Sequence, residues 1–409
     1  MTDIDVGETV VTLADIEAAR VVLGDVARRT PMENSRPLSE RVGGPVALKC
    51  ENLQRAGSFK IRGAYVRIAR LTDEERARGV VAASAGNHAQ GVALAASLLG
   101  CKSTVFMPEG APIPKVQATK AYGADVRFAG TTLDESMPRA QQFADETGAV
   151  LIHPFDHPDI VAGQGTAGLE ILEQYPDVRT IVVSVGGGGL VSGIAAAVKG
   201  IRDDVRVVGV QAAGAAAFPA SLRAGQPTAL SSMATMADGI AVGCPGGLTL
   251  RMVREYVDNI VTVSEESLSK ALLLCLERGK LVVEPAGAAG VAALMDAPSE
   301  FEPPVVSVLS GGNIDPLLLL RVLRHGMATS GRYLSFRLRI PDRPGELAKL
   351  LGEIGAAGAS VLDVAHSRTS PTLPVDEVEV EVQVETRGPE HCDELVARLH
   401  EAGFEATGL

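Results

Sequence analysis

Tryptophan is absent from this 409-residue sequence, and aromatic residues make up only 3% of it. Basic residues are also scarce: 38 Lys and Arg stand against 50 Asp and Glu, which gives a formal net charge of −12 at pH 7. Proteins that bind nucleic acids carry clustered positive charge that attracts the phosphates. We therefore expect no nucleic-acid partner.

Long apolar runs are absent as well. Although 46% of the residues are hydrophobic, no run reaches the roughly 18 apolar residues that cross a bilayer. The first residues, Met1–Asp5, are acidic and lack the basic and apolar regions of a secretory signal. We expect no membrane partner and a cytoplasmic location.

Cysteine is rare, with five residues that are odd in number and widely spaced. No two of them have C-x-x-C spacing, which argues against a structural zinc site. Most lie in apolar segments, as is typical of reduced cytosolic thiols. The five are Cys50, Cys101, Cys244, Cys275 and Cys392.

Hydrophobic periodicity divides the sequence into two regions. Up to about residue 325, short apolar segments alternate with helical patterns, as in Gly79–Ser84 followed by Ala89–Leu99. This alternation predicts an α/β fold with parallel sheets, helices on both faces and ligand sites at the carboxyl ends of the strands. A Gly- and Ser-containing linker is predicted at 326–332.

The last region, 333–409, has a different order of predicted elements: strand, helix, strand, strand, helix, strand. This is the ferredoxin-like α+β order. The strand Glu377–Glu385 alternates valine with acidic or amide residues, which indicates an antiparallel strand buried on one face. The final strand, near Glu405, is expected to be short.

A candidate reactive amine lies at Lys60, between a predicted buried strand, Val46–Cys50, and a helical pattern that begins at Gly63. A lysine is ordinarily a hydrated surface charge. In a desolvated setting it loses its proton more readily and can form a Schiff base with an aldehyde cofactor. The local pattern leaves both interpretations open.

Four consecutive glycines, Gly186–Gly189, follow a predicted strand, Ile181–Val185, and precede a helix that begins at Leu190. Glycine runs are often flexible linkers. At a strand-to-helix turn, however, their N–H groups and the helix dipole attract an anion. No Lys-Ser or Lys-Thr closes the run, so it is not a Walker A loop, and its spacing is not that of the dinucleotide fingerprint. We predict that it binds the phosphate of a cofactor.

Two polar turns also follow predicted strands. Ser84–His88 leads into a helix, and Ser310 ends the strand Val305–Leu309 before two glycines. Serine and asparagine at such places most often cap a helix or form a turn.

Four motifs together resemble the pyridoxal-phosphate enzymes of the tryptophan-synthase β-subunit class, fold type II, and within them the threonine dehydratases. They are Ser58–Ala64, Ser84–Gly91, Gly186–Leu190 and Ser310–Asn313. The resemblance covers about residues 1–325. It implies a two-lobed catalytic domain whose smaller lobe spans roughly residues 54–155.

The resemblance also implies roles for single residues. Lys60 would carry pyridoxal 5'-phosphate, Phe59 would pack beside its ring, and Ser310 would bond its pyridine nitrogen. The remaining cofactor-binding residues would be Asn87, at the phenolic oxygen, with Gly186, Gly187, Gly188, Gly189, Leu190, Gly239 and Glu284. The substrate carboxylate would bind at Ser84, Ala85, Gly86, Asn87 and His88, although an isolated histidine at a helix start is usually structural.

The implied reaction is the conversion of L-threonine to 2-oxobutanoate and ammonia, and of L-serine to pyruvate. Preference between the two substrates stays open, because one methyl group contributes only roughly 1–3 kcal/mol of discrimination. The choice between a biosynthetic and a catabolic role also stays open. A racemase is the nearest rival, but related serine racemases carry a serine where this chain has Ala85, and a methyl group cannot return a proton. A non-enzymatic amino-acid sensor is a further alternative, against which the intact Lys60, glycine run and Ser310 argue.

Two features concern other ligands. Relatives with a cation site carry acidic residues after the strand that corresponds to Val205–Val210, but Gln211–Ala217 has no carboxylate. We therefore expect no divalent metal there, while binding of a monovalent ion by carbonyl oxygens stays open. Asp342–Leu347 resembles the hallmark of ACT domains, which pair with one another and bind amino acids. This implies allosteric control by isoleucine first and valine second, a role in isoleucine biosynthesis, and a homodimer or homotetramer.

Overall fold

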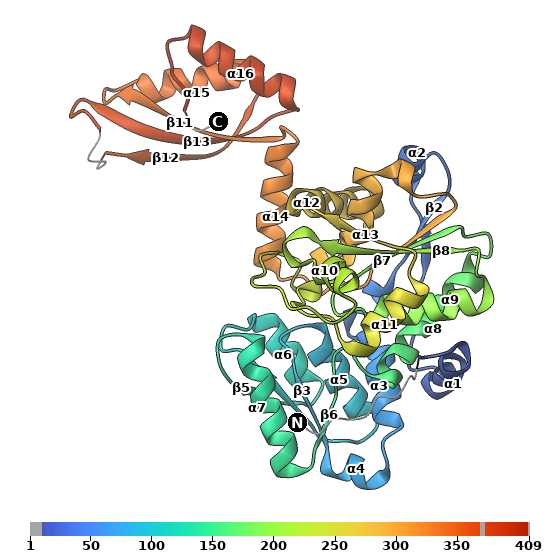
Figure 1. Cartoon of the computed structure of the whole chain (residues 1–409). Helices are drawn as coiled ribbons and strands as arrows, with labels where there is room; N and C mark the ends of the chain where they lie inside the picture. The colour runs from blue at the N-terminus through green and yellow to red at the C-terminus, as the bar shows by residue number, and fades with distance from the viewer. Residues whose placement is uncertain (1–9, 369–372, 408–409) are drawn as a thin grey trace. The chain divides into compact units, whose positions relative to one another are not determined.

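The computed structural model describes residues 10–368 and 373–407 (Figure 1). The chain forms two compact units, which meet in the sequence between Pro316 and Leu317. Among the described residues no helix is long and apolar enough to cross a membrane. All five cysteines are free thiols.

One lobe of the first unit is built on a four-stranded sheet in the order β5-β4-β3-β6, in which every pair is parallel. Its strands are β3 (Val80–Ala83), β4 (Ser103–Met107), β5 (Asp125–Phe128) and β6 (Val150–Leu151). Its helices are α3 (Lys60–Ala69), α4 (Asp73–Arg78), α5 (Asn87–Leu98), α6 (Ile113–Ala121) and α7 (Leu133–Thr147).

The other lobe is built on a six-stranded sheet in the order β1-β2-β10-β7-β8-β9. Its strands are β1 (Met32–Asn34), β2 (Val46–Lys49), β7 (Thr180–Ser184), β8 (Arg206–Ala212), β9 (Asn259–Val263) and β10 (Val305–Val308). Its helices are α1 (Leu13–Leu23), α2 (Arg36–Val42), α8 (Pro158–Gln174), α9 (Gly189–Ile201), α10 (Ala217–Ala224), α11 (Gly247–Tyr256), α12 (Glu265–Leu274) and α13 (Pro285–Asp296). The predicted α/β fold with parallel sheets is confirmed, except that the edge strand β1 runs antiparallel to β2.

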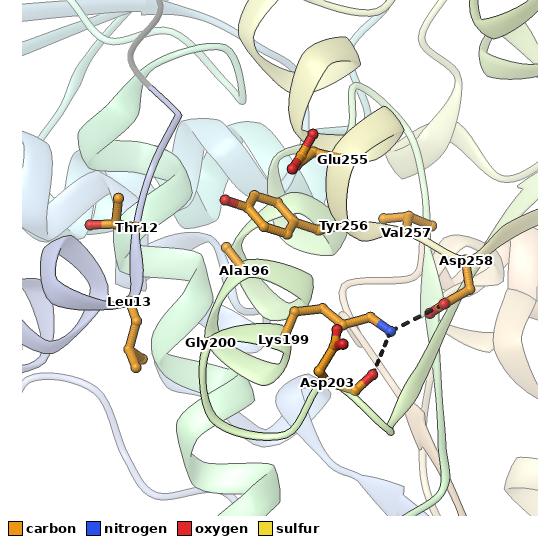
Figure 2. A pocket seen from close by; sticks show the side chains of 10 residues that line it. All are labelled: Thr12, Leu13, Ala196, Lys199, Gly200, Asp203, Glu255, Tyr256, Val257 and Asp258. Atoms are coloured by element: carbon orange, nitrogen blue, oxygen red, sulfur yellow. Dashed lines mark hydrogen bonds and ion pairs between the residues drawn. The ribbon is translucent and has the colours of Figure 1, made fainter.

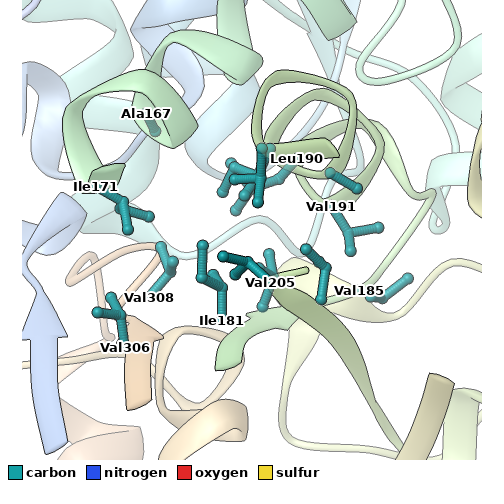
Figure 3. Close-up of a cluster of buried hydrophobic side chains, with 14 of the residues drawn as sticks. Ala167, Ile171, Ile181, Val185, Leu190, Val191, Val205, Val306 and Val308 are labelled. Carbon is teal, nitrogen blue, oxygen red and sulfur yellow. The ribbon is translucent and has the colours of Figure 1, made fainter. Parts of the chain in front are cut away.

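A large buried cluster of this lobe includes residues of the sheet and of helices α8 and α9 (Figure 3). Ile181 of β7 and Val306 of β10 are fully buried, and they belong to one cluster with Ile171 of α8 and Val191 of α9. Burying a side chain of this size stabilises the fold by about 1.5–3 kcal/mol. The packing therefore holds both flanks of the glycine run, β7 before it and α9 after it, in fixed positions.

Local sequence signals predict some helix boundaries correctly and miss others. Thr12 caps α1 through a capping box with Asp15, as its sequence predicts. In the sequence, the helical pattern that opens with Thr12 predicts a helix over residues 12–27. That prediction is wrong at its end, because Gly24 adopts a φ of +46° and terminates α1 at Leu23. The helix predicted from Gly63 instead begins at Lys60, so the lysine is the first helical residue of α3.

The second unit begins with α14 (Pro316–Thr329) and continues with α15 (Glu346–Ala356), α16 (Pro389–Glu401) and three strands. The strands form an antiparallel sheet in the order β11-β13-β12, made of β11 (Tyr333–Pro341), β13 (Glu377–Glu385) and β12 (Ser360–Ser367). Val378, Val380, Val382 and Val384 of β13 are buried, as the alternation predicts.

Two expectations for this unit need correction. Residues 326–329 of the predicted linker are helical, because the apolar pattern of α14 continues through them. The predicted last strand is reduced to an isolated bridge between Thr407 and Arg337 of β11.

Candidate active site

Lys60 opens α3 with its side chain turned toward the end of β6. Its Nζ donates a hydrogen bond of 2.8 Å to the carbonyl oxygen of Pro154 and lies 5.2 Å from the centroid of the Phe59 ring. Desolvation lowers the pKa of Lys60 to about 8, although the charge of Glu284 acts to raise it. Near neutral pH the amine therefore loses its proton far more easily than an exposed lysine, as a nucleophile or base must.

The glycine run carries unused hydrogen-bond donors. Among the described residues, the backbone N–H groups from Gly186 to Leu190 have no backbone acceptor. The Oγ of Ser184, at the end of β7, is buried and likewise has no partner among them. Orphaned donors at the N-terminus of a helix form an anion-binding site. The run thus has the chemistry that a phosphate requires.

Space and backbone conformation both require glycine in this run. Gly188 has a φ of +93°, a conformation that costs other residues about 1–2 kcal/mol. A Cβ on Gly187 would lie 2.3 Å from the ring of Phe155, and one on Gly189 would lie 3.1 Å from the Phe155 Cβ. The side chain of Leu190 is buried in the core cluster, so only its backbone is available to a ligand.

The segment that follows β6 joins the lysine to the glycine run, and sequence reasoning missed it. Pro154 accepts the Lys60 hydrogen bond, and the next residue, Phe155, packs on the run. The carboxylate of Asp156 accepts the backbone N–H of Thr249 at 3.0 Å and so holds the start of α11. Because ligands bind at the carboxyl ends of parallel strands, its position after β6 was the available signal.

A chain of amide and carboxyl groups lies beside Lys60. Asn87 Nδ2 donates to Glu284 at 2.5 Å, and Asn313 Nδ2 donates to Asn87 Oδ1 at 2.8 Å. Burial, together with the charge of Asp238, raises the pKa of Glu284 to about 7. The Cβ position of Gly239 lies 3.4 Å from Glu284 Oε1. The structure therefore brings Asn87, Gly239 and Glu284, three of the predicted cofactor-binding residues, together.

The Ser310 loop lies against the residues that precede Lys60. The carbonyl of Ser310 accepts the backbone N–H of Phe59 at 3.2 Å, and Gly311 forms a bridge with Ser58. Ser310 is buried at 4% exposure, and the Ser58 Oγ is buried without a partner among the described residues. Hydroxyls of the kind that bond a ring nitrogen are thus present beside the lysine.

The Ser84–His88 turn ends at the first turn of α5. Ser84 Oγ accepts the backbone N–H of Gly86 at 3.2 Å, while the N–H groups of Asn87 and His88 have no backbone acceptor within the described chain. The ring of His88 pairs through Nε2 with the carbonyl of Ile152 at 2.8 Å, and desolvation lowers its pKa to about 3. His88 is thus a neutral, internally bonded histidine, and the free N–H groups, with the Ala85 methyl beside them, suit a carboxylate.

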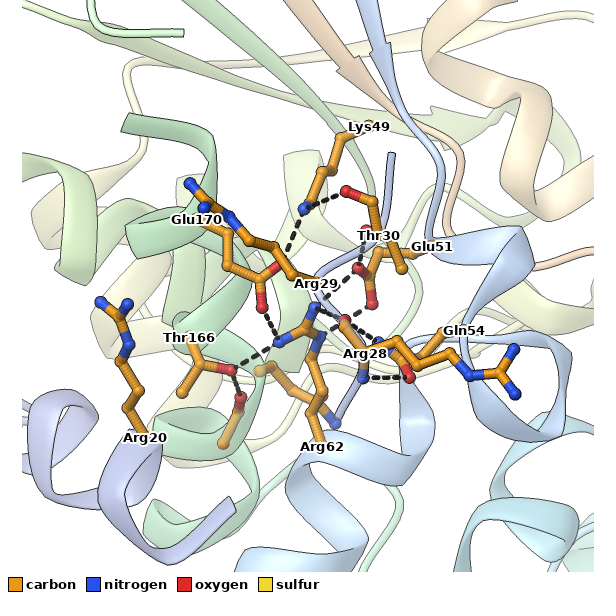
Figure 4. Close-up of polar contacts among 12 residues, drawn as sticks. Arg20, Arg28, Arg29, Thr30, Lys49, Glu51, Gln54, Arg62, Thr166 and Glu170 are labelled. Carbon is orange, nitrogen blue, oxygen red and sulfur yellow. Dashed lines mark hydrogen bonds and ion pairs between the residues drawn. The ribbon is translucent and has the colours of Figure 1, made fainter. Parts of the chain in front are cut away.

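Behind Lys60, the side chain of Arg62 enters a buried ion network (Figure 4). Its guanidinium donates to both oxygens of Glu51 at 2.8 Å and to Glu170 at 2.7 Å, while Lys49 donates to the other oxygen of Glu170 at 2.6 Å. Burial acts to raise the pKa of Glu51, but Arg62 outweighs it and the pKa is lowered. The network holds α3, and with it Lys60, against β2 and α8.

A separate pocket of about 420 Å³ contains none of these residues (Figure 2). Its one lysine, Lys199, already bonds Asp258 and the carbonyl of Asp203, both at 3.1 Å. The functional groups of the predicted site lie instead around Lys60. Its desolvated amine, the orphaned donors of the glycine run and the unpartnered hydroxyls fit pyridoxal phosphate, which needs an amine for its aldehyde and donors for its phosphate.

The chain is similar to known proteins over most of its length. A family model described as "Pyridoxal-phosphate dependent enzyme" matches residues 24–311. The L-threonine ammonia-lyase of Thermotoga maritima is 46% identical over 395 residues, covering 97% of this chain and 98% of that protein. The solved threonine deaminase isoform 2 of Solanum lycopersicum has a TM-score of 0.73 and 38% identity, covering 76% of this chain and 86% of the other. The solved serine racemase of maize has a TM-score of 0.73 and 36% identity, covering 78% of this chain and 99% of the other. These comparisons confirm the resemblance that the four motifs carry.

Proposed function

The chain belongs to the pyridoxal-phosphate-dependent enzymes, and from that basis we propose that it converts L-threonine to 2-oxobutanoate and ammonia. L-Serine, which gives pyruvate, is the second substrate. The observation that carries this proposal is the desolvated amine of Lys60, whose pKa is lowered to about 8. It lies beside Phe59, and through Pro154 and Phe155 it is linked to the glycine run.

The cofactor would be held by residues from both lobes. Lys60 would hold its aldehyde carbon, and the N–H groups of the glycine run, from Gly186 to Leu190, would hold its phosphate. Ser310 would bond the pyridine nitrogen, and Asn87, oriented by Glu284 and Asn313, would bond the phenolic oxygen. A neutral hydroxyl at the ring nitrogen leaves that nitrogen less protonated than a carboxylate would, which suits elimination.

When bound, pyridoxal phosphate supplies a sink for the electrons left at the substrate α-carbon. The amine of Lys60 would remove the α-proton of the substrate. The N–H groups at the start of α5 hold the carboxylate, and the neutral His88 keeps the turn in place through Ile152. Loss of the β-hydroxyl as water then leaves an enamine, whose hydrolysis gives the 2-keto acid and ammonia.

Dehydration is favoured over racemisation because no proton donor is present at Ala85. A racemase needs a second acid on the opposite face of the substrate, and a methyl group cannot serve. The purified protein incubated with L-serine should release pyruvate and form little D-serine, as measured by chiral chromatography. Sustained D-serine formation would assign the chain to the racemases instead.

We further propose that the second unit is an ACT domain that binds isoleucine, with valine as a weaker ligand, in a homo-oligomeric enzyme of isoleucine biosynthesis. Asp342, at the end of β11, forms a two-point ion pair with Arg368 at 2.8 and 3.0 Å, and Gly345 begins α15 at a φ of +98°. These contacts shape the turn at which such a ligand would bind. Coupling of this kind is usually worth about 1–3 kcal/mol.

Two experiments test these proposals. Borohydride reduction of the yellow protein, followed by peptide mapping, should place the label on Lys60, and a label on another residue would remove the basis for every role above. Keto-acid release from L-threonine and L-serine should be measured with and without isoleucine. If isoleucine changes neither turnover nor KM, the regulatory proposal fails while the catalytic one stands.

A further inference from the structure

A buried lysine of α6 pairs with an aspartate of the other lobe. Lys115 is 7% exposed, and its Nζ forms a short ion pair with Oδ2 of Asp238, a residue 123 positions away. Asp238 begins a short 3-10 helix, η4 (Asp238–Ile240). A buried ammonium is costly unless it is paired, and the proposed mechanism makes no use of this one. The pair therefore needs an explanation of its own.

The 3-10 helix η4 lies between two parts of the active site. The Cβ position of Gly186 is 3.0 Å from the Cα of Ile240, and that of Gly239 is 2.9 Å from the Cβ of Ala286 at the start of α13. A Cβ on Gly239 would also approach Glu284 Oε1 to 3.4 Å. Any displacement of η4 would therefore disturb the glycine run and Glu284 together.

Four elements present charged or polar groups to Glu284. Asp238 of η4 and Lys115 of α6 act on it with opposite signs, Lys60 of α3 adds positive charge, and Asn87 of α5 donates a hydrogen bond. The buried Glu284 has a pKa of about 7, so small changes in these charges alter how much of it is ionised near neutral pH.

We propose that Lys115 is a positioning residue: its ion pair with Asp238 ties α6 to η4, holds η4 against Gly186 and Glu284, and balances the charge that Glu284 experiences. The proposal rests on the proposed function, because Glu284 reaches the cofactor through Asn87. It adds a role for Lys115 and Asp238, which the proposed mechanism does not use.

Substitutions at the two ends of the pair have opposite electrostatic effects. Lys115→Met leaves the Asp238 carboxylate unbalanced, so Glu284 holds its proton to higher pH. Asp238→Asn leaves the Lys115 ammonium unbalanced, so Glu284 loses its proton at lower pH. The double variant removes both charges and therefore returns the charge balance toward that of the parent, but it does not restore the tie between α6 and η4.

The test uses the full-length holoenzyme, the two single variants, the double variant and a matched control. The control is Lys199→Met, because Lys199 is also a shielded lysine, paired with Asp258 at 3.1 Å, but lies in α9 beside the separate pocket. The pH dependence of kcat/KM for keto-acid release from L-threonine reports on Glu284. Hydrogen–deuterium exchange of peptides covering residues 237–242 reports on η4 and does not depend on activity.

In the pH profile of kcat/KM, we expect the midpoint nearest neutral pH to rise in Lys115→Met and to fall in Asp238→Asn, by roughly half to one pH unit each. The midpoint of the double variant should lie between those of the two single variants. Exchange in residues 237–242 should be at least about twofold faster in all three variants and unchanged in Lys199→Met. Equal shifts in one direction, no shift, or unchanged exchange would overturn the proposal. If borohydride labelling of Lys60 fails, the proposed function falls, and the exchange result still decides whether Lys115 positions η4.

Discussion

Replacing Arg62 with methionine tests whether the ion network behind the lysine holds the fold together. The substitution removes the bidentate partner of Glu51, a residue with 0% exposure. Among the described residues, Thr30 is then the remaining side-chain hydrogen-bond donor to that carboxylate. Glu170 keeps a charged partner in the variant, because Lys49 still pairs with it. Removing one partner of a buried ion pair typically costs about 3–5 kcal/mol of unfolding free energy. We expect a loss in that range.

The assay is urea unfolding, followed by circular dichroism, of the cofactor-free protein at about pH 7 and about pH 5. In the parent, the lowered pKa of Glu51 contributes stability above its unfolded-state pKa, and this is lost as pH falls through the folded-state value. Without Arg62, burial raises that pKa, so the deficit of the variant should be largest at neutral pH and shrink in acid. Adding Glu51→Gln to the Arg62→Met variant should recover part of the lost unfolding free energy, because the amide carries no charge. The exposed Arg36–Glu40 pair supplies the control, Arg36→Met, which should leave the midpoint unchanged. A deficit under about 1 kcal/mol would refute the reasoning.

Three further outcomes follow from the site. Lys60→Ala should lower keto-acid release by more than the roughly 10²–10⁴-fold typical of a general base, and near-normal turnover would contradict both of its roles. Gly187→Val should abolish cofactor absorbance, because its side chain would meet the Phe155 ring at 2.3 Å, and full occupancy would show that the run holds no phosphate. The raised pKa of Glu284 makes stability fall as pH rises from about 4.5 to about 7. Glu284→Gln should therefore raise the melting temperature of cofactor-free protein more at pH 8 than at pH 5. An equal change in melting temperature at the two pH values would contradict a raised pKa of Glu284.

The sequence by itself determined the features that repeat locally. The βα alternation, the Thr12 cap and the alternating valines of β13 follow from periods of two or 3.6 residues and from short-range hydrogen bonds. Lys60, the glycine run and the Ser310 turn could be named because each lies within a contiguous motif. Helix ends were less certain, as at Gly24, where one backbone dihedral stops α1.

Only the tertiary structure decided which distant side chains meet. Phe155 packs on the glycine run, Arg62 reaches Glu170 across 108 positions, and Lys115 reaches Asp238 across 123. Such pairs leave no periodic signal, because chain separation does not determine the distance between two residues in the folded protein. The lowered pKa of Lys60 and the raised pKa of Glu284 arise in the same way, from desolvation and charges that the folded chain alone brings together.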